Sequence, residues 1–299
     1  MPMLKAVSPD VIKPGHVKGL ISGPSGVGKT FFGLDFPRPY LIDTEKGATR
    51  PQYKNKLKEV NGVYFGKEEG SQNLKTVVEE VKLLATTKHD YKTLLLDSFS
   101  ALYLGEAAKA EEKVGNDFGR DKKEANRPTR QLLRWLDNLD MNVWLICHRK
   151  DKWARKANGE VEYAGSTFDG YEKLEYILDL WIEVEESKGD RFFTVKKSRI
   201  DSLPKGNTYP LDYSRFAELY GKETIEKSSI PLTMATDEQI AKVTHLTEVV
   251  KIEPEEIEKW FTKADVDSWT EMTSEQIQKA IDFLEKKIQS VGNGKARTK

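Results

Sequence analysis

Eight residues near the start of the chain have the types and spacing that hold a nucleoside triphosphate. They follow the pattern G-x-x-x-x-G-K-[ST] and are Gly23, Pro24, Ser25, Gly26, Val27, Gly28, Lys29 and Thr30. Glycines let backbone N–H groups converge on phosphate oxygens where a helix begins. In this pattern Lys29 reaches the β- and γ-phosphates and Thr30 binds magnesium. The chain lacks the N-K-x-D motif that reads guanine. We therefore expect ATP and Mg²⁺ as the cofactors.

A second metal ligand and a base are expected at the ends of two short strands. The apolar run Thr93–Leu96 is followed by Asp97, whose carboxylate would hold the magnesium shell. Many ATPases place a Glu directly after this Asp, but here the next residue is Ser98. Glu45, two residues past the segment Tyr40–Asp43, is therefore the candidate that orients the attacking water. A solvated loop glutamate is the alternative interpretation.

A basic stretch with one aromatic residue follows the apolar run that ends near residue 147. Basic side chains along phosphates, with an aromatic ring for base stacking, suit single-stranded DNA of any sequence. The candidate DNA-binding residues are Arg149, Lys150, Lys152, Trp153, Arg155 and Lys156. Gly159, Gly165 and Gly170 follow in a polar stretch, which predicts a mobile loop to about residue 170. A basic surface loop that does not bind DNA is the alternative.

Short apolar runs alternate with helical stretches through about residue 200. Strands are expected at His16–Ile21, Pro39–Ile42, Gly62–Phe65, Thr93–Leu96 and Val143–Ile146, and helices at Leu74–Leu84 and Arg130–Leu139. Such alternation is typical of a parallel sheet with helices on both faces. Leu180–Glu185 and Arg191–Lys196 predict a hairpin that turns at Gly189-Asp190. The sheet is therefore expected to end in antiparallel edge strands.

The chain is expected to contain two domains and a tail. The α/β domain covers residues 1–228, after which the strand signals stop. Two capping boxes, Thr236–Gln239 and Thr273–Gln276, each open an amphipathic run. Residues 229–291 are therefore predicted to form a three-helix domain. The last segment, 292–299, is polar and rich in glycine and lysine, so it is predicted to be disordered.

Composition excludes some classes of protein. Positive and negative side chains balance at 48 each, so nucleic acid must be bound by a local basic patch. The single cysteine, Cys147, excludes internal disulfides and fits a reducing compartment. Its side chain is expected to be buried in the protein core. No apolar run approaches the roughly 18 residues that cross a bilayer. A cytoplasmic protein without a membrane partner is the expectation.

The order of these motifs resembles the core of RecA-like recombinases. Gly23–Thr30, Asp43–Glu45, Leu94–Ser98 and Trp144–His148 follow one another as they do in that family. The likeness extends over about residues 15–220. It is strongest to compact phage-encoded RecA-like ATPases of the single-strand annealing type. The resemblance implies an α/β fold, namely a RecA-like P-loop NTPase core with a small C-terminal helical domain.

The resemblance also implies roles for single residues. Glu45 matches the base that follows the second strand in the family. His148 stands where RecA has Gln, and would sense the γ-phosphate and couple it to the DNA loops; a residue that only completes hydrogen bonds is the alternative. Lys197 and Arg199 match basic residues that reach the neighbouring subunit's ATP. Residues two apart on a strand point the same way, so both side chains could meet one phosphate. The alternative is that they belong to an exposed basic edge strand that discourages aggregation.

The leading hypothesis is an ATPase that binds single-stranded DNA and promotes strand annealing or exchange with DNA-stimulated hydrolysis. Expected partners are single-stranded DNA, further copies of the chain in a ring or filament, and a single-strand-binding protein. The expected location is the cytoplasm of a bacterial host if the chain is phage-encoded. One alternative is a RecA-core helicase or helicase loader. The other is a nucleotide-dependent regulatory or scaffold ATPase that does not bind DNA.

Overall fold

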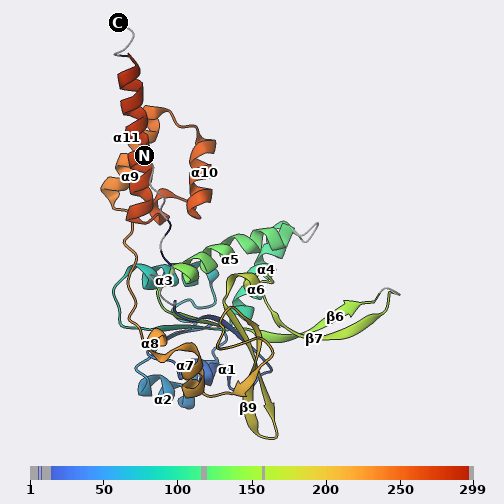
Figure 1. Cartoon of the computed structure of the whole chain (residues 1–299). Coiled ribbons are helices and arrows are strands. Elements are labelled where there is room, and N and C mark those ends of the chain that lie inside the picture. The colour runs from blue at the N-terminus through green and yellow to red at the C-terminus, as the bar shows by residue number, and fades with distance from the viewer. Residues whose placement is uncertain (1–5, 7, 9–14, 116–119, 157–158, 296–299) are drawn as a thin grey trace. The chain divides into compact units, whose positions relative to one another are not determined.

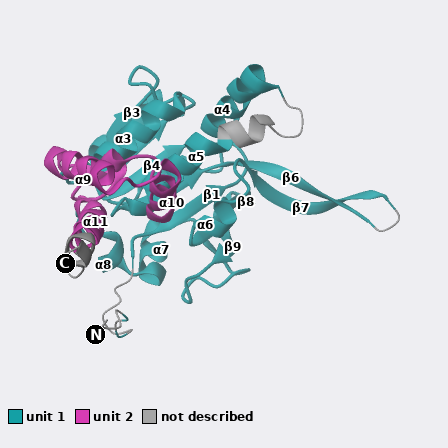
Figure 2. Cartoon of the chain, turned by 90° about the horizontal axis from the view of Figure 1, so that it is seen from above, with its two compact units in different colours: residues 1–84, 88–230 teal, residues 85–87, 231–299 magenta. Residues whose placement is uncertain are grey.

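The computed structural model describes residues 6, 8, 15–115, 120–156 and 159–295. The chain divides into two compact units (Figure 2). Unit 1 contains residues 1–84 and 88–230, and unit 2 contains residues 85–87 and 231–299. No helix in the described part of the chain is long and apolar enough to cross a membrane.

A central sheet organises unit 1 (Figure 1). Among the described residues its eight strands are β1 (Lys18–Ser22), β2 (Pro39–Asp43), β3 (Val63–Phe65), β4 (Thr93–Asp97), β5 (Asn142–Ile146), β8 (Leu180–Ser187), β9 (Asp190–Ser198) and β10 (Thr208–Pro210). Their order across the sheet is β10-β9-β8-β1-β5-β4-β2-β3. The six strands from β8 to β3 run parallel, whereas β9 and β10 pair antiparallel at one edge. The predicted mostly parallel sheet with antiparallel edge strands is confirmed.

The central strands are apolar because both of their faces are covered. Every residue of β5 is buried, and so are the first four residues of β4. Strands covered on both faces form continuous apolar runs, which is the pattern that the sequence has here. The strand expected from His16 begins two residues later, at Lys18. The edge hairpin turns at Lys188 and Gly189, one residue before the expected position, with φ of 54° and 88°.

Helices cover both faces of the sheet. They are α1 (Lys29–Leu34), α2 (Pro51–Glu59), α7 (Tyr213–Tyr220) and α8 (Lys222–Ile225) on one face, and α3 (Leu74–Thr86), α4 (Phe99–Val114) and α5 (Arg120–Asn138) on the other (Figure 1). Under α1 and α7, the Trp144 ring packs against Phe32, Phe36 and Phe216 at centroid distances of 5.5–6.2 Å. A Cβ at Gly19 would meet this indole at 2.2 Å, so only glycine allows the ring to lie across β1.

A two-stranded hairpin takes the place of the predicted mobile loop. Strands β6 (His148–Arg155) and β7 (Val161–Asp169) pair antiparallel, and both views show them projecting from the body of unit 1 (Figures 1 and 2). The prediction of a loop through about residue 170 is therefore wrong. Most side chains of β6 are exposed, so the strand carries no apolar alternation by which a sequence reveals a strand. Residues 157–158, at the turn, lie outside the described residues.

Unit 2 is helical. It contains α9 (Asp237–Val250), α10 (Pro254–Ala264), a 3₁₀ turn (Trp269–Glu271) and α11 (Ser274–Lys295). Both capping boxes form: the Thr236 hydroxyl accepts from Gln239 N at 3.2 Å, and the Thr273 hydroxyl accepts from Gln276 N at 3.2 Å. The prediction of a disordered tail from residue 292 is wrong for residues 292–295, because α11 continues to Lys295. Residues 296–299 lie outside the described residues.

Candidate functional site

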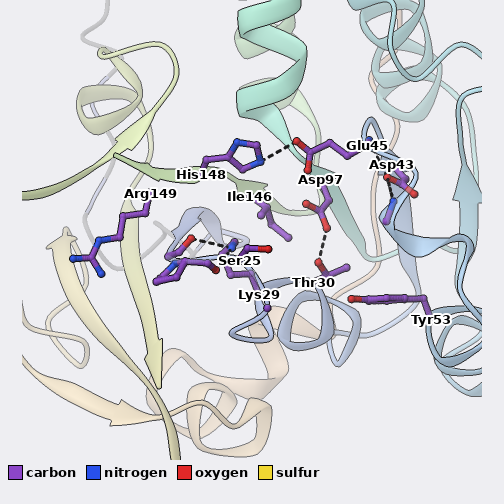
Figure 3. Close-up of a pocket in the computed structure, with 14 residues that line it drawn as sticks. Ser25, Lys29, Thr30, Asp43, Glu45, Tyr53, Asp97, Ile146, His148 and Arg149 are labelled. Atoms are coloured by element: carbon purple, nitrogen blue, oxygen red, sulfur yellow. Dashed lines mark hydrogen bonds and ion pairs between the residues drawn. The ribbon is translucent and has the colours of Figure 1, made fainter. Parts of the chain in front are cut away.

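A cavity of about 520 Å³ opens at the carboxyl ends of the parallel strands (Figure 3). Ligands of open α/β sheets bind at this edge, where loops from several strands converge. Its lining residues come from the loops after β1 and β2, the last residues of β2, β4 and β5, the first two residues of β6, and the first turns of α1 and α2. They are Gly23, Pro24, Ser25, Gly26, Lys29, Thr30, Asp43, Glu45, Gly47, Tyr53, Asp97, Ile146, His148 and Arg149.

The predicted phosphate loop joins β1 to α1 and forms one wall of the cavity. Gly23, Gly26 and Gly28 have φ of 150°, 82° and 97°, in the region that favours glycine. A Cβ at Gly23 would also lie 2.3 Å from the Val184 carbonyl oxygen. Val27 is buried in the core, so this loop is anchored beneath the site. The glycines thus allow a backbone shape that other residues would strain.

Lys29 lies over this loop. Its Nζ donates to the carbonyl oxygens of Gly23 at 2.9 Å and Pro24 at 2.7 Å. Burial lowers the pKa of Lys29, while the carboxylates of Asp97 and Glu45 act in the opposite direction. A partly desolvated ammonium held by weak acceptors is available to a more strongly charged partner such as phosphate.

Thr30 and Asp97 are the pair predicted to bind a metal ion, and the structure brings them together. Thr30 Oγ1 donates to Asp97 Oδ2 at 2.5 Å, although the two residues are 67 positions apart. Burial raises the pKa of Asp97 to about 6, and the Thr30 hydrogen bond opposes that rise. A hydroxyl and a carboxylate oxygen side by side are ligands that Mg²⁺ accepts. The described residues therefore fit a magnesium ion bound with the nucleotide.

Asp43 lies beside Asp97 on the neighbouring strand but has a different task. Its carboxylate accepts hydrogen bonds from the backbone N–H groups of Glu45, Gly47 and Ala48 at 3.1, 3.2 and 2.9 Å. It also accepts from the Tyr64 hydroxyl at 3.2 Å. Both oxygens are thus used to fold the loop that presents Glu45 to the cavity.

Glu45 and His148 meet at the rim of the cavity (Figure 3). Glu45 Oε1 lies 2.9 Å from His148 Nε2, and Ser98 Oγ lies 3.3 Å from the same nitrogen. His148 N donates to Ser100 Oγ at 2.9 Å. The structure therefore brings the expected base and the expected sensor into direct contact, next to the metal pair.

Arg149 differs in position from the other candidate DNA-binding residues. It lines the cavity, with Nε 3.6 Å from Glu183 Oε1 and Nη1 3.4 Å from Glu185 Oε1. Glu183 is buried and also receives Ser166 Oγ at 2.6 Å and Lys196 Nζ at 2.9 Å. Arg149 thus anchors the hairpin to β8.

The remaining candidate DNA-binding residues lie along the hairpin. Trp153 is 60% exposed and packs edge-on against Tyr163 at a centroid distance of 5.7 Å. Lys150 lies 3.5 Å from the half-buried Asp169, and Lys156 lies 3.1 Å from Glu162 in an exposed ion pair. The other two, Lys152 and Arg155, are exposed on β6.

Lys197 and Arg199 lie outside the cavity, near the start of β8. Lys197 Nζ donates to the Leu178 carbonyl, and Arg199 contacts Asp179 Oδ1 at 3.0 Å and the Tyr176 carbonyl at 2.6 Å. Arg199 follows the end of β9, so only Lys197 belongs to the strand. Both side chains nevertheless reach the same connecting segment. Their role toward a neighbouring subunit stays a prediction.

Several residues at the cavity were not expected from the sequence. Tyr53 on α2 lines it, with its ring 4.7 Å from that of Phe31, and Gly47 and Ile146 complete the wall. Ser98 and Ser100 hold His148. Tyr53 stands in a polar helix without any motif, so only its position in space reveals it. Cys147 is free and buried, as expected.

Among the solved structures to which the chain is similar is one described as the crystal structure of the RadB recombinase. The two share 17% sequence identity with a TM-score of 0.42, over 64% of this chain and 84% of that chain. No curated protein matches the chain.

A family model described as an AAA domain matches residues 16–214. That span is about two thirds of the chain and contains the whole cavity. With the sheet order above, the match confirms the predicted fold class: a mostly parallel sheet flanked by helices, with antiparallel edge strands and a helical C-terminal region. The chain therefore belongs to the AAA domain family.

Proposed function

We propose that this protein is a Mg-ATP hydrolase whose turnover is coupled to single-stranded DNA. The observation that carries the proposal is the shared cavity. The phosphate loop, the Thr30–Asp97 pair and Glu45 line it together with His148, the first residue of the projecting hairpin. A nucleotide site and the base of an exposed basic ribbon are thus built from adjacent residues.

Each side chain of the cavity has a distinct task in this proposal. Lys29 leaves its two carbonyl partners and binds the β- and γ-phosphate oxygens. Thr30 and Asp97 hold magnesium, which neutralises charge on the phosphates when bound. Glu45 orients the attacking water and accepts its proton. Protonated Asp97 would weaken the metal site, so nucleotide binding should decline as the pH falls below about 6.

The hairpin supplies the DNA surface in this proposal. Trp153 and Tyr163 are 60% and 51% exposed, and they form an aromatic step on which unstacked bases can lie. Lys152 and Arg155 on the same strand would track the phosphates. Arg149 would not touch DNA, because Glu183 and Glu185 hold it at the cavity.

The proposal also includes assembly and a biological task. Lys197 and Arg199 would contact the ATP of a neighbouring copy in a ring or filament, and so neutralise developing charge. The assembly would anneal or exchange DNA strands together with a single-strand-binding protein. A phage origin and a cytoplasmic location belong to the same hypothesis.

Measuring ATP hydrolysis with and without unstructured single-stranded DNA tests the proposal. We expect hydrolysis to be stimulated at least about tenfold, and to be lost in Lys29→Ala. Lys58→Ala, which removes an exposed lysine of α2, is the matched control and should behave as wild type.

Two results would contradict the proposal in different ways. Turnover that is unaffected by DNA would favour a regulatory ATPase that does not bind DNA. Equal turnover by Lys29→Ala and wild type would reject the nucleotide site itself.

A further inference from the structure

The antiparallel edge of the central sheet lies against both ends of the phosphate loop. We call β8 and β9 with their turn, residues 180–198, the edge hairpin. Because β8 pairs parallel with β1 as far as Ser22 and Glu183, its next residues run beside the loop that follows β1. A Cβ at Gly23 would lie only 2.3 Å from the Val184 carbonyl oxygen. The edge hairpin therefore touches the phosphate loop where that loop begins.

A second contact lies at the other end of the loop and involves Arg191, the second residue of β9. A Cβ at Gly28 would lie 3.2 Å from Arg191 Nη1 and 3.6 Å from Arg191 Cδ. The guanidinium thus lies beside the backbone of Gly28, the residue directly before Lys29 and Thr30. Arg191 is not among the residues that line the cavity, so it approaches the loop from outside. A cation therefore supports the loop without entering the nucleotide site.

Two contacts hold Arg191 in this place. Its Nε donates to Glu186 Oε2 at 3.1 Å, and the two residues are register partners on adjacent strands. The Arg191 carbonyl oxygen accepts from Leu211 N at 2.9 Å, which fixes the backbone on its other side. Within the described part of the chain, Glu186 is the acid that pairs with this guanidinium. The side chain is therefore aimed at Gly28 by one cross-strand partner.

We propose that Arg191 is a positioning residue of the phosphate loop. Its guanidinium holds Gly28 by contact and adds positive charge beside the phosphates of the nucleotide. This inference rests on the proposed function. Lys29 lines the cavity and meets the phosphates directly, whereas Arg191 acts across the loop through its charge.

The two members of the ion pair should have opposite effects on nucleotide binding. Glu186 carries a negative charge at the same place, so it cancels part of the attraction that Arg191 exerts on phosphate. Removing the charge of Arg191 should weaken binding, and removing the charge of Glu186 should strengthen it. An ion pair that only stabilised the edge hairpin would lose the same interaction in either variant, so both variants would change binding in one direction.

The first test is equilibrium binding of Mg-ATP to the full chain, measured by titration calorimetry at low salt, because exposed charges are screened at high salt. Arg191→Met keeps an unbranched stem without the charge and should weaken binding about tenfold. Arg191→Lys keeps the charge and should stay within about threefold of wild type. Glu186→Gln should bind about threefold more tightly than wild type.

A matched control and a rate measurement complete this test. Arg215→Met removes an arginine of similar exposure that pairs with Glu218 on α7, and its affinity should equal that of wild type. At saturating ATP, hydrolysis by Arg191→Met should stay within about threefold of wild type, because Arg191 does not touch the reacting atoms. Equal affinities of Arg191→Met and Arg215→Met would overturn the proposal. Weaker binding by both Arg191→Met and Glu186→Gln would reduce the ion pair to a structural role and overturn it as well.

The second test needs no nucleotide. Hydrogen exchange of residues 23–30 in the nucleotide-free chain, read by mass spectrometry, reports how firmly the phosphate loop is held. Exchange should be at least about threefold faster in Arg191→Ala, whereas Arg215→Ala should match wild type. Unchanged exchange in Arg191→Ala would overturn the contact. Faster exchange in a chain that binds no nucleotide would reject the proposed function and keep Arg191 as the support of the loop.

Discussion

The two tryptophans Trp144 and Trp153 show how differently the two parts of unit 1 are built. Trp144 on β5 is fully buried among aromatic rings of α1 and α7. Its ring fits only because residue 19 is a glycine, which has no side chain. Trp153 on β6 is 60% exposed on a ribbon of two strands. Packing therefore determines the residues of the sheet, whereas most side chains of β6 are not constrained by packing. Mutations at matched positions can test this difference.

The largest effect is expected at Glu45, in the loop that follows β2. Glu45→Gln keeps the size of the side chain but cannot accept a proton, so ATP hydrolysis should fall by about 10³-fold. Nucleotide affinity should change little, because Lys29 and the phosphate loop are intact. Single-turnover hydrolysis with saturating ATP measures this effect. Activity within about tenfold of wild type would mean that the base lies elsewhere.

Truncating the two tryptophans should separate stability from binding. Trp144→Ala removes a ring packed against Phe32, Phe36 and Phe216, so the free energy of unfolding should fall by about 3–5 kcal/mol. Trp153→Ala should change it by less than about 0.5 kcal/mol. Denaturant unfolding gives both numbers, and Trp144→Phe is a milder variant if the alanine does not fold. Equal losses would show that the hairpin is packed in solution.

Asp97 links the stability of the nucleotide-free protein to pH. Burial raises the pKa of Asp97 from 3.8 to about 6, so the folded state favours the protonated form. Its contribution to stability is full below pH 4 and is lost as the pH rises through about 6. Asp97→Asn carries no charge and therefore avoids this loss. At pH 8 its free energy of unfolding should exceed that of wild type by at most about 3 kcal/mol, and thermal unfolding should show a higher midpoint. The difference should vanish toward pH 4. A difference in unfolding free energy that does not depend on pH would contradict the raised pKa of Asp97.

The smallest effect is expected on the hairpin. Trp153→Ala should weaken binding of a single-stranded oligonucleotide about tenfold, because stacking contributes about 1–3 kcal/mol per base. Fluorescence anisotropy at fixed salt measures the affinity. Tyr176→Ala, which removes an aromatic side chain that is 77% exposed outside the hairpin, is the control. Equal losses of affinity in the two variants would show that the oligonucleotide does not bind preferentially at the hairpin.

The sheet could be predicted because burial leaves a pattern in the sequence. The runs Thr93–Leu96 and Val143–Ile146 are apolar on both faces, and both are strands in the structure. Their ends gave the positions of Asp97 and His148. The hairpin could not be predicted, because its side chains face solvent on both sides and its sequence resembles that of a loop.

The candidate site was predicted where a motif or a strand end marked it. Lys29, Thr30, Asp97, Glu45 and His148 all line one cavity. Contacts that depend on three-dimensional approach left no such mark. Tyr53 enters from a polar helix, and Arg149 turns to Glu183, which lies 34 residues away. Such contacts become visible only when the fold brings these side chains together.

The saturated carboxylate of Asp43 has a consequence for metal stoichiometry. Asp43 and Asp97 are register partners on adjacent strands, so two carboxylates lie at the same end of the sheet. The four donors on Asp43 leave its oxygens no capacity for a second ion. In the proposed function the acidic pair therefore serves a single divalent cation, at Asp97, whereas Asp43 shapes the loop that carries Glu45.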